Sequence, residues 1–233
     1  MISSFALAHR REDLDLAQFN HHWQHVHGPL IARLGYLRGY TQNMATSSSA
    51  VARPPLHDAS VDGIAGFFWD DLDDARRPAT DPTYTEAGQL DETNFLDITR
   101  LVMIEAVPEM VRGPSSFPAA PGYDVKAILL VGRADTASDQ TFAEGCRGHW
   151  RAGPTDDAPD RCVLHLTRGD GSVIEADQPA AIIEAWWRAR ERYAAWCDGA
   201  AIKSFVNASF VNAGRSSIFL ASEHHVIVPP PVG

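Results

Sequence analysis

Alternating hydrophobic and polar positions predict four strands in the first hundred residues, over 2–11, 36–44, 61–69 and 98–107. Between the first two strands we expect a helix that is capped by Asp13 or Asp15 and that runs to about Leu34, before Gly35. An acidic stretch over 70–97 is predicted to be helical at both ends, with a break at Pro78 and Pro82. This β-α-β-β-α-β order is the ferredoxin-like arrangement of an α+β protein.

The second half repeats this order of elements. Strands are expected over 123–133, 161–168, 180–187 and 216–228, with helices over 138–151 and from 188 toward 210. His22-Trp23 followed by Gly28-Pro29 also matches His149-Trp150 followed by Gly153-Pro154. We therefore expect a tandem duplication, with a first repeat at 1–110, a proline- and glycine-rich linker at 111–122, and a second, degenerate repeat at 123–233. The unpatterned segment 45–60 is expected to form a lid or an edge flap.

The helix near the N-terminus carries a cluster of histidines in FNHHWQHVHGPLIARL, residues 19–34. On a helical wheel His27 falls inside the apolar sector, His22 lies on its flank, and His21 and His25 point away from it. The apolar sector is formed by Phe19, Trp23, Val26, Leu30 and Leu34. One imidazole is therefore predicted to face the protein interior, where it needs a partner or a ligand.

Composition limits the classes of function. The net charge of −10 and the lack of a basic run argue against nucleic-acid binding. We expect no signal peptide, and no apolar stretch approaches the length of a membrane span. The three cysteines are widely spaced, which is typical of a reducing compartment, so we expect a cytoplasmic protein.

The first half resembles the EthD-like family of the dimeric α/β-barrel superfamily. The similarity is carried by Phe19, Trp23, the run His27-Gly28-Pro29-Leu30, Gly39-Tyr40, Gln42-Asn43, and the segment FFWDDLDDARRPATDPTYTEAGQLDETNFLD. It covers residues 1–108 well and the second half only by topology. The resemblance implies that two ferredoxin-like units join their sheets into a barrel, here within one chain as a pseudo-dimer. It also implies small aromatic or lactone ligands bound between sheet and helices, commonly without a cofactor.

His27 is the leading catalytic candidate, as a general acid or base facing a cavity between helix and sheet. The competing interpretation is a buried structural histidine bonded to the second strand. A helix broken at Gly28-Pro29 would leave backbone groups free to bind a ligand. Tyr40 could donate a proton, and His22 completes the catalytic candidates. The predicted substrate contacts are Trp23, Trp69, His9 and Asn43.

Other chemistry has less support. His21 and His25 have the i, i+4 spacing of metal ligands, but no HExxH motif or third ligand is evident. Haem ligation by a histidine stays open as a weaker alternative, and His224-His225 is expected at a strand end. Cys146 lies near Arg147 and His149, in the half that lacks the signature, so packing is the simpler interpretation. We expect neither a metal nor another cofactor.

These observations favour a cofactor-independent lyase or dehydratase acting on a small phenolic or polyketide-like aromatic compound. Proton abstraction and elimination need one base, one proton donor and an apolar cavity. Retro-aldol release of a small aldehyde would need the same groups. The alternatives are an oxidoreductase, either a cofactor-free monooxygenase or a haem protein, an isomerase, and a non-catalytic module that binds small ligands. We expect a homodimer with a small aromatic substrate.

Overall fold

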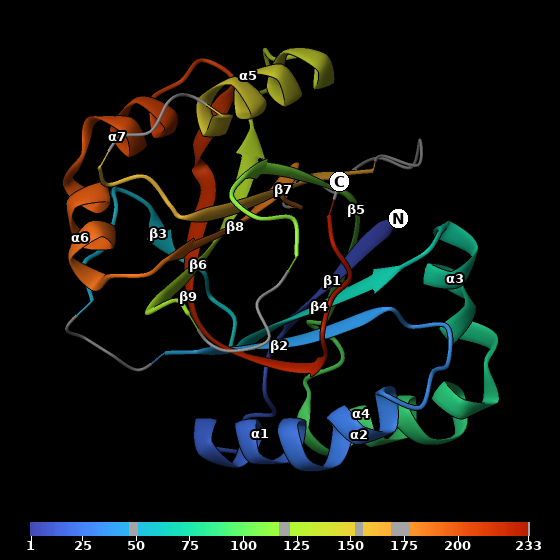
Figure 1. Ribbon diagram of the computed structural model, residues 1–233. Coiled ribbons are helices and arrows are strands. Elements are labelled where there is room, and N and C mark those ends of the chain that lie inside the picture. Colours follow the sequence, from blue (N-terminus) through green and yellow to red (C-terminus); the bar gives the residue numbers. More distant parts are fainter. Residues whose placement is uncertain (47–50, 117–121, 152–155, 169–177, 233) are drawn as a thin grey trace. The chain divides into compact units, whose positions relative to one another are not determined.

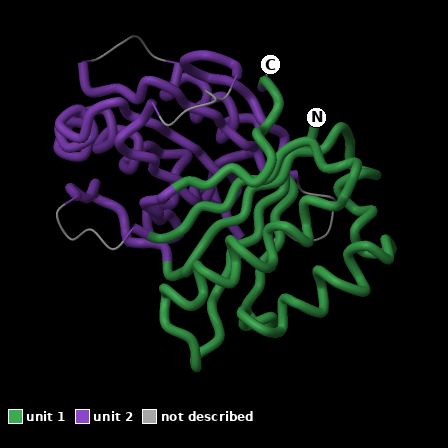
Figure 2. Tube along the Cα trace, turned by 60° about the horizontal axis from the view of Figure 1, so that its bottom comes forward, with its two compact units in different colours: residues 1–45, 60–105, 223–231 green, residues 46–59, 106–222, 232–233 purple. Residues whose placement is uncertain are grey.

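The computed structural model describes residues 1–46, 51–116, 122–151, 156–168 and 178–232 (Figure 1). The chain forms two compact units (Figure 2). The first unit comprises Met1–Ala45, Ser60–Glu105 and Glu223–Pro231, and the second comprises Thr46–Ala59, Ala106–Ser222 and Val232–Gly233. Each unit combines antiparallel strands with helices, so the predicted α+β class is confirmed.

The sheet of the first unit is built from β1 (Ile2–Ala8), β2 (Gly39–Ala45), β4 (Gly63–Trp69) and the beginning of β5 (Val102–Arg112). Its strand order is β2-β4-β1-β5, the order of a ferredoxin-like unit. Strand β4 runs antiparallel to both neighbours, and Phe67 pairs with Ser4 on one side and Tyr40 on the other. All four predicted strands are therefore present, although the second begins at Gly39 and the fourth at Val102.

The histidine-rich segment folds as α1 (Leu16–His22), a π-helical turn η1 (Trp23–His27) and α2 (Gly28–Ile31). Of the two predicted caps, Asp15 is the one used, and it forms a reciprocal capping box with Gln18. The predicted break at Gly28-Pro29 is wrong, because the helix continues through these residues. The wider turn lets the Gly28 N–H bond to the Trp23 carbonyl, which accommodates Pro29 and its missing N–H.

The π-helical turn also explains one wrong prediction about the apolar sector. Val26 is 43% exposed, whereas Trp23 and His27 are 3% and 5% exposed. A turn with i→i+5 bonds rotates each residue by less than an α-helical step, so Val26 moves out of the sector while Trp23 and His27 remain inward.

The acidic stretch contains α3 (Leu72–Arg76), a 3₁₀ turn η2 (Arg77–Thr80), a π-helical turn η3 (Tyr84–Gly88) and α4 (Gln89–Phe95). It is helical at both ends and interrupted near its prolines, as predicted. These helices and the histidine-rich one pack on the same face of the sheet, since Phe19, Trp23, Trp69 and Phe95 share one hydrophobic core.

The second unit contains β6 (Val125–Arg133), β7 (Arg161–Thr167), β8 (Ala181–Trp187) and β9 (Val211–Ile227) in the order β7-β8-β6-β9. Its helices are α5 (Asp139–Arg151), α6 (Arg190–Asp198) and α7 (Ala200–Val206). By order of appearance, both units place the second, third, first and fourth strands side by side. The predicted repetition of element order is therefore present.

The matched His-Trp pairs occupy similar surroundings in the two units. Trp23 and Trp150 are each 3% exposed and belong to the core of their own unit. The ring of His22 lies 5.0 Å from Phe95, and that of His149 lies 4.8 Å from Phe205. The second marker of the later copy, Gly153-Pro154, lies outside the described residues.

Each unit is made of several separate segments of the chain, whereas the prediction gave each repeat one contiguous range. Strand β5 continues through Arg112, beyond the expected boundary at 110 and into the expected linker 111–122, of which 117–121 lie outside the described residues. Within the segment 45–60, β3 (His57–Asp58) pairs in parallel with β9 and adds a short edge strand to the second unit. Residues 47–50 are not described. Among the described residues, no helix is long and apolar enough to cross a membrane.

Candidate active site

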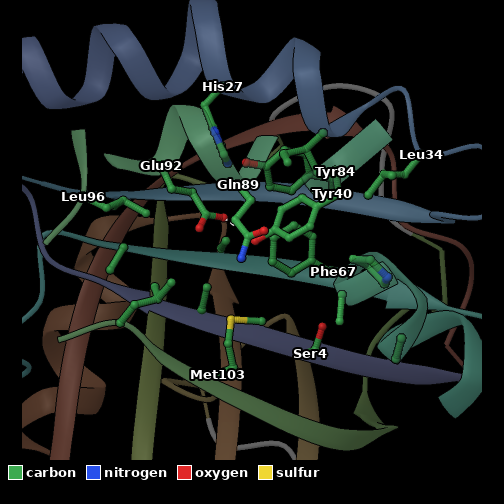
Figure 3. A pocket seen from close by; sticks show the side chains of 18 of the residues that line it. Ser4, His27, Leu34, Tyr40, Phe67, Tyr84, Gln89, Glu92, Leu96 and Met103 are labelled. Atoms are coloured by element: carbon green, nitrogen blue, oxygen red, sulfur yellow. Dashed lines mark hydrogen bonds between the residues drawn. The ribbon is translucent and has the colours of Figure 1, made fainter. Parts of the chain in front are cut away.

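A cavity of about 440 Å³ lies in the first unit, between one face of the sheet and the helices that pack on it (Figure 3). Small side chains on the sheet leave this space open: Ser4, Ala6 and Ala8 on β1 and Ala65 on β4. The helices contribute larger residues from one face, namely Trp23, His27, Ile31 and Leu34 from the histidine-rich segment and Tyr84, Gln89, Glu92 and Phe95 from the acidic one.

Aromatic side chains form one wall of the cavity. The ring of Phe67 stacks 4.8 Å from Tyr40 at an interplanar angle of 17°, and lies 6.0 Å from Trp69. The indole N–H of Trp69 donates to the Ser4 hydroxyl at 2.9 Å, and that of Trp23 donates to the Tyr40 oxygen at 3.0 Å. The polar edges of both indoles are satisfied within the protein, so neither N–H group needs a partner from a ligand.

His27 enters the cavity from the helical side (Figure 3). Its Nδ1 lies 3.1 Å from Oδ2 of Asp91 on α4. Burial lowers the pKa of His27 to about 4, although the Asp91 carboxylate opposes this effect, so the imidazole is neutral at pH 7. A carboxylate only accepts hydrogen bonds, so Nδ1 of the neutral ring carries the hydrogen and Nε2 is left as the basic atom.

Asp91 joins His27 to a second histidine. Nε2 of His22 lies 2.9 Å from Oδ1 and 3.1 Å from Oδ2 of Asp91, and the Asn94 amide donates to Oδ1 at 3.1 Å. Burial acts to raise the pKa of Asp91, but the hydrogen bonds from Asn94, His22 and His27 outweigh it and hold the pKa below its usual value. Asp91 is therefore ionised at neutral pH and suited to orient the His27 ring.

Tyr40 presents its hydroxyl to the same cavity. Its oxygen accepts from the Trp23 indole at 3.0 Å and from the Gln42 amide at 3.1 Å. Burial raises the pKa of Tyr40, so the group stays protonated. Because both neighbours donate, the hydroxyl hydrogen of Tyr40 is left to donate to a bound ligand.

Glu92 on α4 and Tyr84 on η3 also line the cavity, and they bond to each other. The Tyr84 hydroxyl donates to Oε1 of Glu92 at 2.6 Å. Burial raises the pKa of Glu92, the hydrogen bond from Tyr84 opposes this rise, and the charge of Asp91 adds to it. At the rim, Arg76 forms a bidentate ion pair with Glu105, at 3.0 and 2.9 Å.

The predicted site residues fall into two groups. Four of them line the cavity together: His27, Tyr40, Trp23 and Trp69. His22 is not a lining residue and contacts Asp91 instead. Asn43 and His9 are not among the lining residues. The Asn43 amide donates to the Ile64 carbonyl at 2.9 Å, because alternation along β2 turns Asn43 to the face opposite Tyr40 and Gln42, and His9 lies beyond the end of β1.

Asp91, Glu92 and Tyr84 were not predicted as site residues. They lie in the acidic stretch, where charges usually face solvent. The signal that could have found them is spacing, since Asp91 and Glu92 precede the buried Phe95 by four and three residues and so share its helix face.

The surface histidines do not extend the site. The His21 and His25 rings lie 4.7 Å apart, and both residues are exposed. Within the described ranges, no group of three or more histidine, cysteine or acidic side chains could hold a metal ion. Cys146 is buried, and burial raises the pKa of its thiol to about 12.

Residues 11–99 match the family model of the EthD domain. This segment of the chain is therefore similar to an EthD domain. It contains His27, Tyr40 and Glu92 of the cavity lining, and Asp91, which bonds to His27. A comparison with curated protein sequences finds no match.

Solved structures that resemble the whole chain agree with the fold. An anthrone oxidase-like protein has a TM-score of 0.66 at 9% identity, covering 100% of this chain and 96% of its own. A "putative monooxygenase" from Fusobacterium nucleatum subsp. nucleatum has a TM-score of 0.63 at 6% identity, covering 100% and 95%. Another protein described in the same words, from Lactobacillus acidophilus, has a TM-score of 0.57 at 8% identity, covering 99% and 97%.

Proposed function

We propose that this protein is a cofactor-independent enzyme that removes a proton from a small, largely aromatic substrate bound in the first unit. His27 is the general base, and the observation that carries this proposal is its hydrogen bond to Asp91 from within an aromatic cavity. The bond leaves the basic Nε2 atom of a neutral imidazole for the substrate. The cavity volume of about 440 Å³ suits a ligand of two or three fused rings.

The predicted lyase or dehydratase activity follows if the substrate carries a hydroxyl group β to the carbanion. Loss of the proton to His27 is then followed by loss of the hydroxyl as water, and the ring gains a double bond. Retro-aldol release of an aldehyde uses the same base on a hydroxyl proton. Tyr40 supports these reactions, because its free hydrogen can bond to the oxygen on which charge develops.

An oxidoreductase is the second candidate, favoured by the fold shared with an anthrone oxidase-like protein and with proteins described as monooxygenases. The same deprotonation would give an electron-rich carbanion that reacts with O₂. For anthrone, oxidation by one O₂ gives anthraquinone and one water. A non-catalytic ligand-binding module remains the third candidate.

The test uses two probes with purified protein. With 3-hydroxy-1-tetralone, a lyase forms 1-naphthol and water, which fluorescence detects. With anthrone in air, an oxidase consumes O₂ and forms anthraquinone. A His27→Gln variant should lower the rate of either reaction by about 10²–10⁴. If wild-type protein binds 1-naphthol but accelerates neither reaction, and His27→Gln binds it equally well, the module interpretation replaces the enzyme.

We further propose that the two units arose by tandem duplication and join as an intramolecular α/β barrel. The support is the shared strand order and the similarity of the whole chain to the three solved structures. The expected homodimer stays a prediction, and light scattering coupled to gel filtration would measure the mass in solution.

A further inference from the structure

We propose that Glu92 is the proton donor of this site, giving its hydrogen to a substrate oxygen while His27 removes a proton from carbon. The inference rests on the proposed function and assigns a second catalytic residue to it. Its basis is the placement of Glu92 in the cavity wall and the contacts around its carboxyl group.

Adjacent residues of α4 point to different partners. Asp91 turns toward His22 and His27, behind the cavity wall, while Glu92 lines the cavity itself. Figure 3 shows the Glu92 carboxyl group and the His27 ring both directed into the cavity, with Tyr84 beside them. A substrate between these groups would meet a basic nitrogen and a carboxyl group at once.

The surroundings of Glu92 favour its acid form. Among the described residues, no lysine, arginine or histidine forms an ion pair with its carboxyl group. The other glutamate of the cavity, Glu105, differs in this respect, since Arg76 neutralises it at the rim. Burial without a cation penalises the carboxylate and raises the pKa of Glu92, which favours a protonated acid.

Tyr84 is a positioning residue for Glu92. Its hydroxyl donates to Oε1 at 2.6 Å, which leaves Oε2 as the atom that can carry the hydrogen toward a ligand. This hydrogen bond also opposes the rise in the pKa of Glu92. Tyr84 would therefore fix the direction of the donor and limit the rise in its pKa.

The proton transfers balance without an oxidant. For an aromatic ring ketone, a C–H bond breaks at a carbon whose carbanion is conjugated with the carbonyl group, and its proton moves to Nε2 of His27. The electron pair forms a new C=C bond while the π electrons of the C=O bond move to the oxygen. The carbonyl oxygen takes the hydrogen of Glu92, so the product is the enol, with His27 cationic and Glu92 anionic. Exchange of protons with water restores both groups. In a dehydration, the hydrogen of Glu92 goes instead to the leaving hydroxyl.

Exchange of the C10 hydrogens of anthrone in D₂O, under argon, measures this enolisation directly. The Glu92→Gln variant should lower the enzyme-dependent exchange rate by about 10²–10⁴, the usual effect of a general acid. The matched control is Glu86→Gln, which removes an exposed glutamate from the neighbouring turn η3 and should leave the rate unchanged. Mass spectrometry follows deuterium uptake.

Infrared spectroscopy adds a readout that does not depend on turnover. In a pH titration, the difference between wild type and Glu92→Gln should contain the C=O band of a protonated carboxyl group that persists to a higher pH than that of an exposed glutamate, and Glu86→Gln should not remove that band. Tyr84→Phe should move the pH at which the band disappears upward, because it removes a hydrogen bond that favours the carboxylate.

The outcomes separate the two proposals. Normal exchange in Glu92→Gln together with a strong loss in His27→Gln would overturn the donor role and leave the proposed function standing. A carboxylic acid band that disappears at the pH of an ordinary exposed glutamate would also overturn the donor role. Wild-type protein that exchanges anthrone no faster than buffer would overturn the proposed function, and the donor role with it.

Discussion

Oδ2 of Asp91 lies 3.1 Å from Nδ1 of His27, although the two residues are 64 positions apart in the chain. This contact fixes which nitrogen of the imidazole carries hydrogen, and so determines that the atom facing the cavity is a base. His22 and Asn94 bond to the same carboxylate and hold it in place. In the proposed function, the carboxylate and the imidazole therefore act together, as in other sites where a carboxylate orients a histidine.

Replacing Asp91 by asparagine should lower turnover by about 10²–10⁴. The amide N–H₂ can donate to Nδ1 of His27, which moves the ring hydrogen to Nε2 and leaves no base in the cavity. The rate of anthrone exchange measures the effect, and circular dichroism controls for folding. A rate close to that of wild type would show that His27 does not need Asp91.

Protein stability should fall between pH 6.5 and pH 4. The pKa of His27 in the folded protein is about 4, below the value near 6.5 of an unfolded histidine, so in this range the unfolded chain binds more protons. The contribution of His27 is fully present above pH 6.5 and is lost as the pH falls, with an upper size of about 3 kcal/mol.

Urea unfolding of wild type and His27→Gln at pH 7 and pH 5 measures this contribution. The loss of unfolding free energy between the two pH values should be smaller in the variant, because glutamine does not titrate. An equal loss in both proteins would contradict the lowered pKa of His27.

The small side chains of the sheet should determine how much space the cavity offers to a ligand. Ala65 is 4% exposed and lines the cavity from β4, so Ala65→Leu should fill part of the space and weaken the binding of 1-naphthol by at least tenfold. Ala195→Leu on the exposed face of α6 is the matched control and should bind like wild type. Quenching of tryptophan fluorescence measures affinity, and equal binding by both variants would place the ligand elsewhere.

The Trp23 indole should stabilise the folded protein both by packing and by its hydrogen bond to Tyr40. Trp23→Phe keeps an aromatic ring but removes the donor to the Tyr40 oxygen, so one of two hydrogen bonds to a buried hydroxyl is lost. We expect a loss of about 1–3 kcal/mol in unfolding free energy, measured in urea. Phe67→Leu, which retains this hydrogen bond, tests whether packing alone accounts for the loss.

Sequence reasoning predicted the order of elements because each strand and helix carries its own periodicity. It also predicted that His27 faces inward, since Trp23 and Phe19 mark the buried side of the same helix. It failed at Val26 and at the supposed break before Pro29, because the π-helical turn depends on the contact of Gly28 with the Trp23 carbonyl. Asp91 was missed for a different reason: which carboxylate of an acidic stretch meets a distant imidazole depends on how two helices pack.

The membership of Glu223–Pro231 in the first unit has a consequence for synthesis of the protein. Val226 packs on the hydrophobic core around Trp23, and Pro229 lies so close to Gly39 that an added Cβ would come within 2.6 Å of its Cα. The first unit is therefore completed by residues that are translated only after Ala106–Ser222 of the second unit. Until these residues have emerged from the ribosome, the nascent chain holds His27 without the segment that completes its unit.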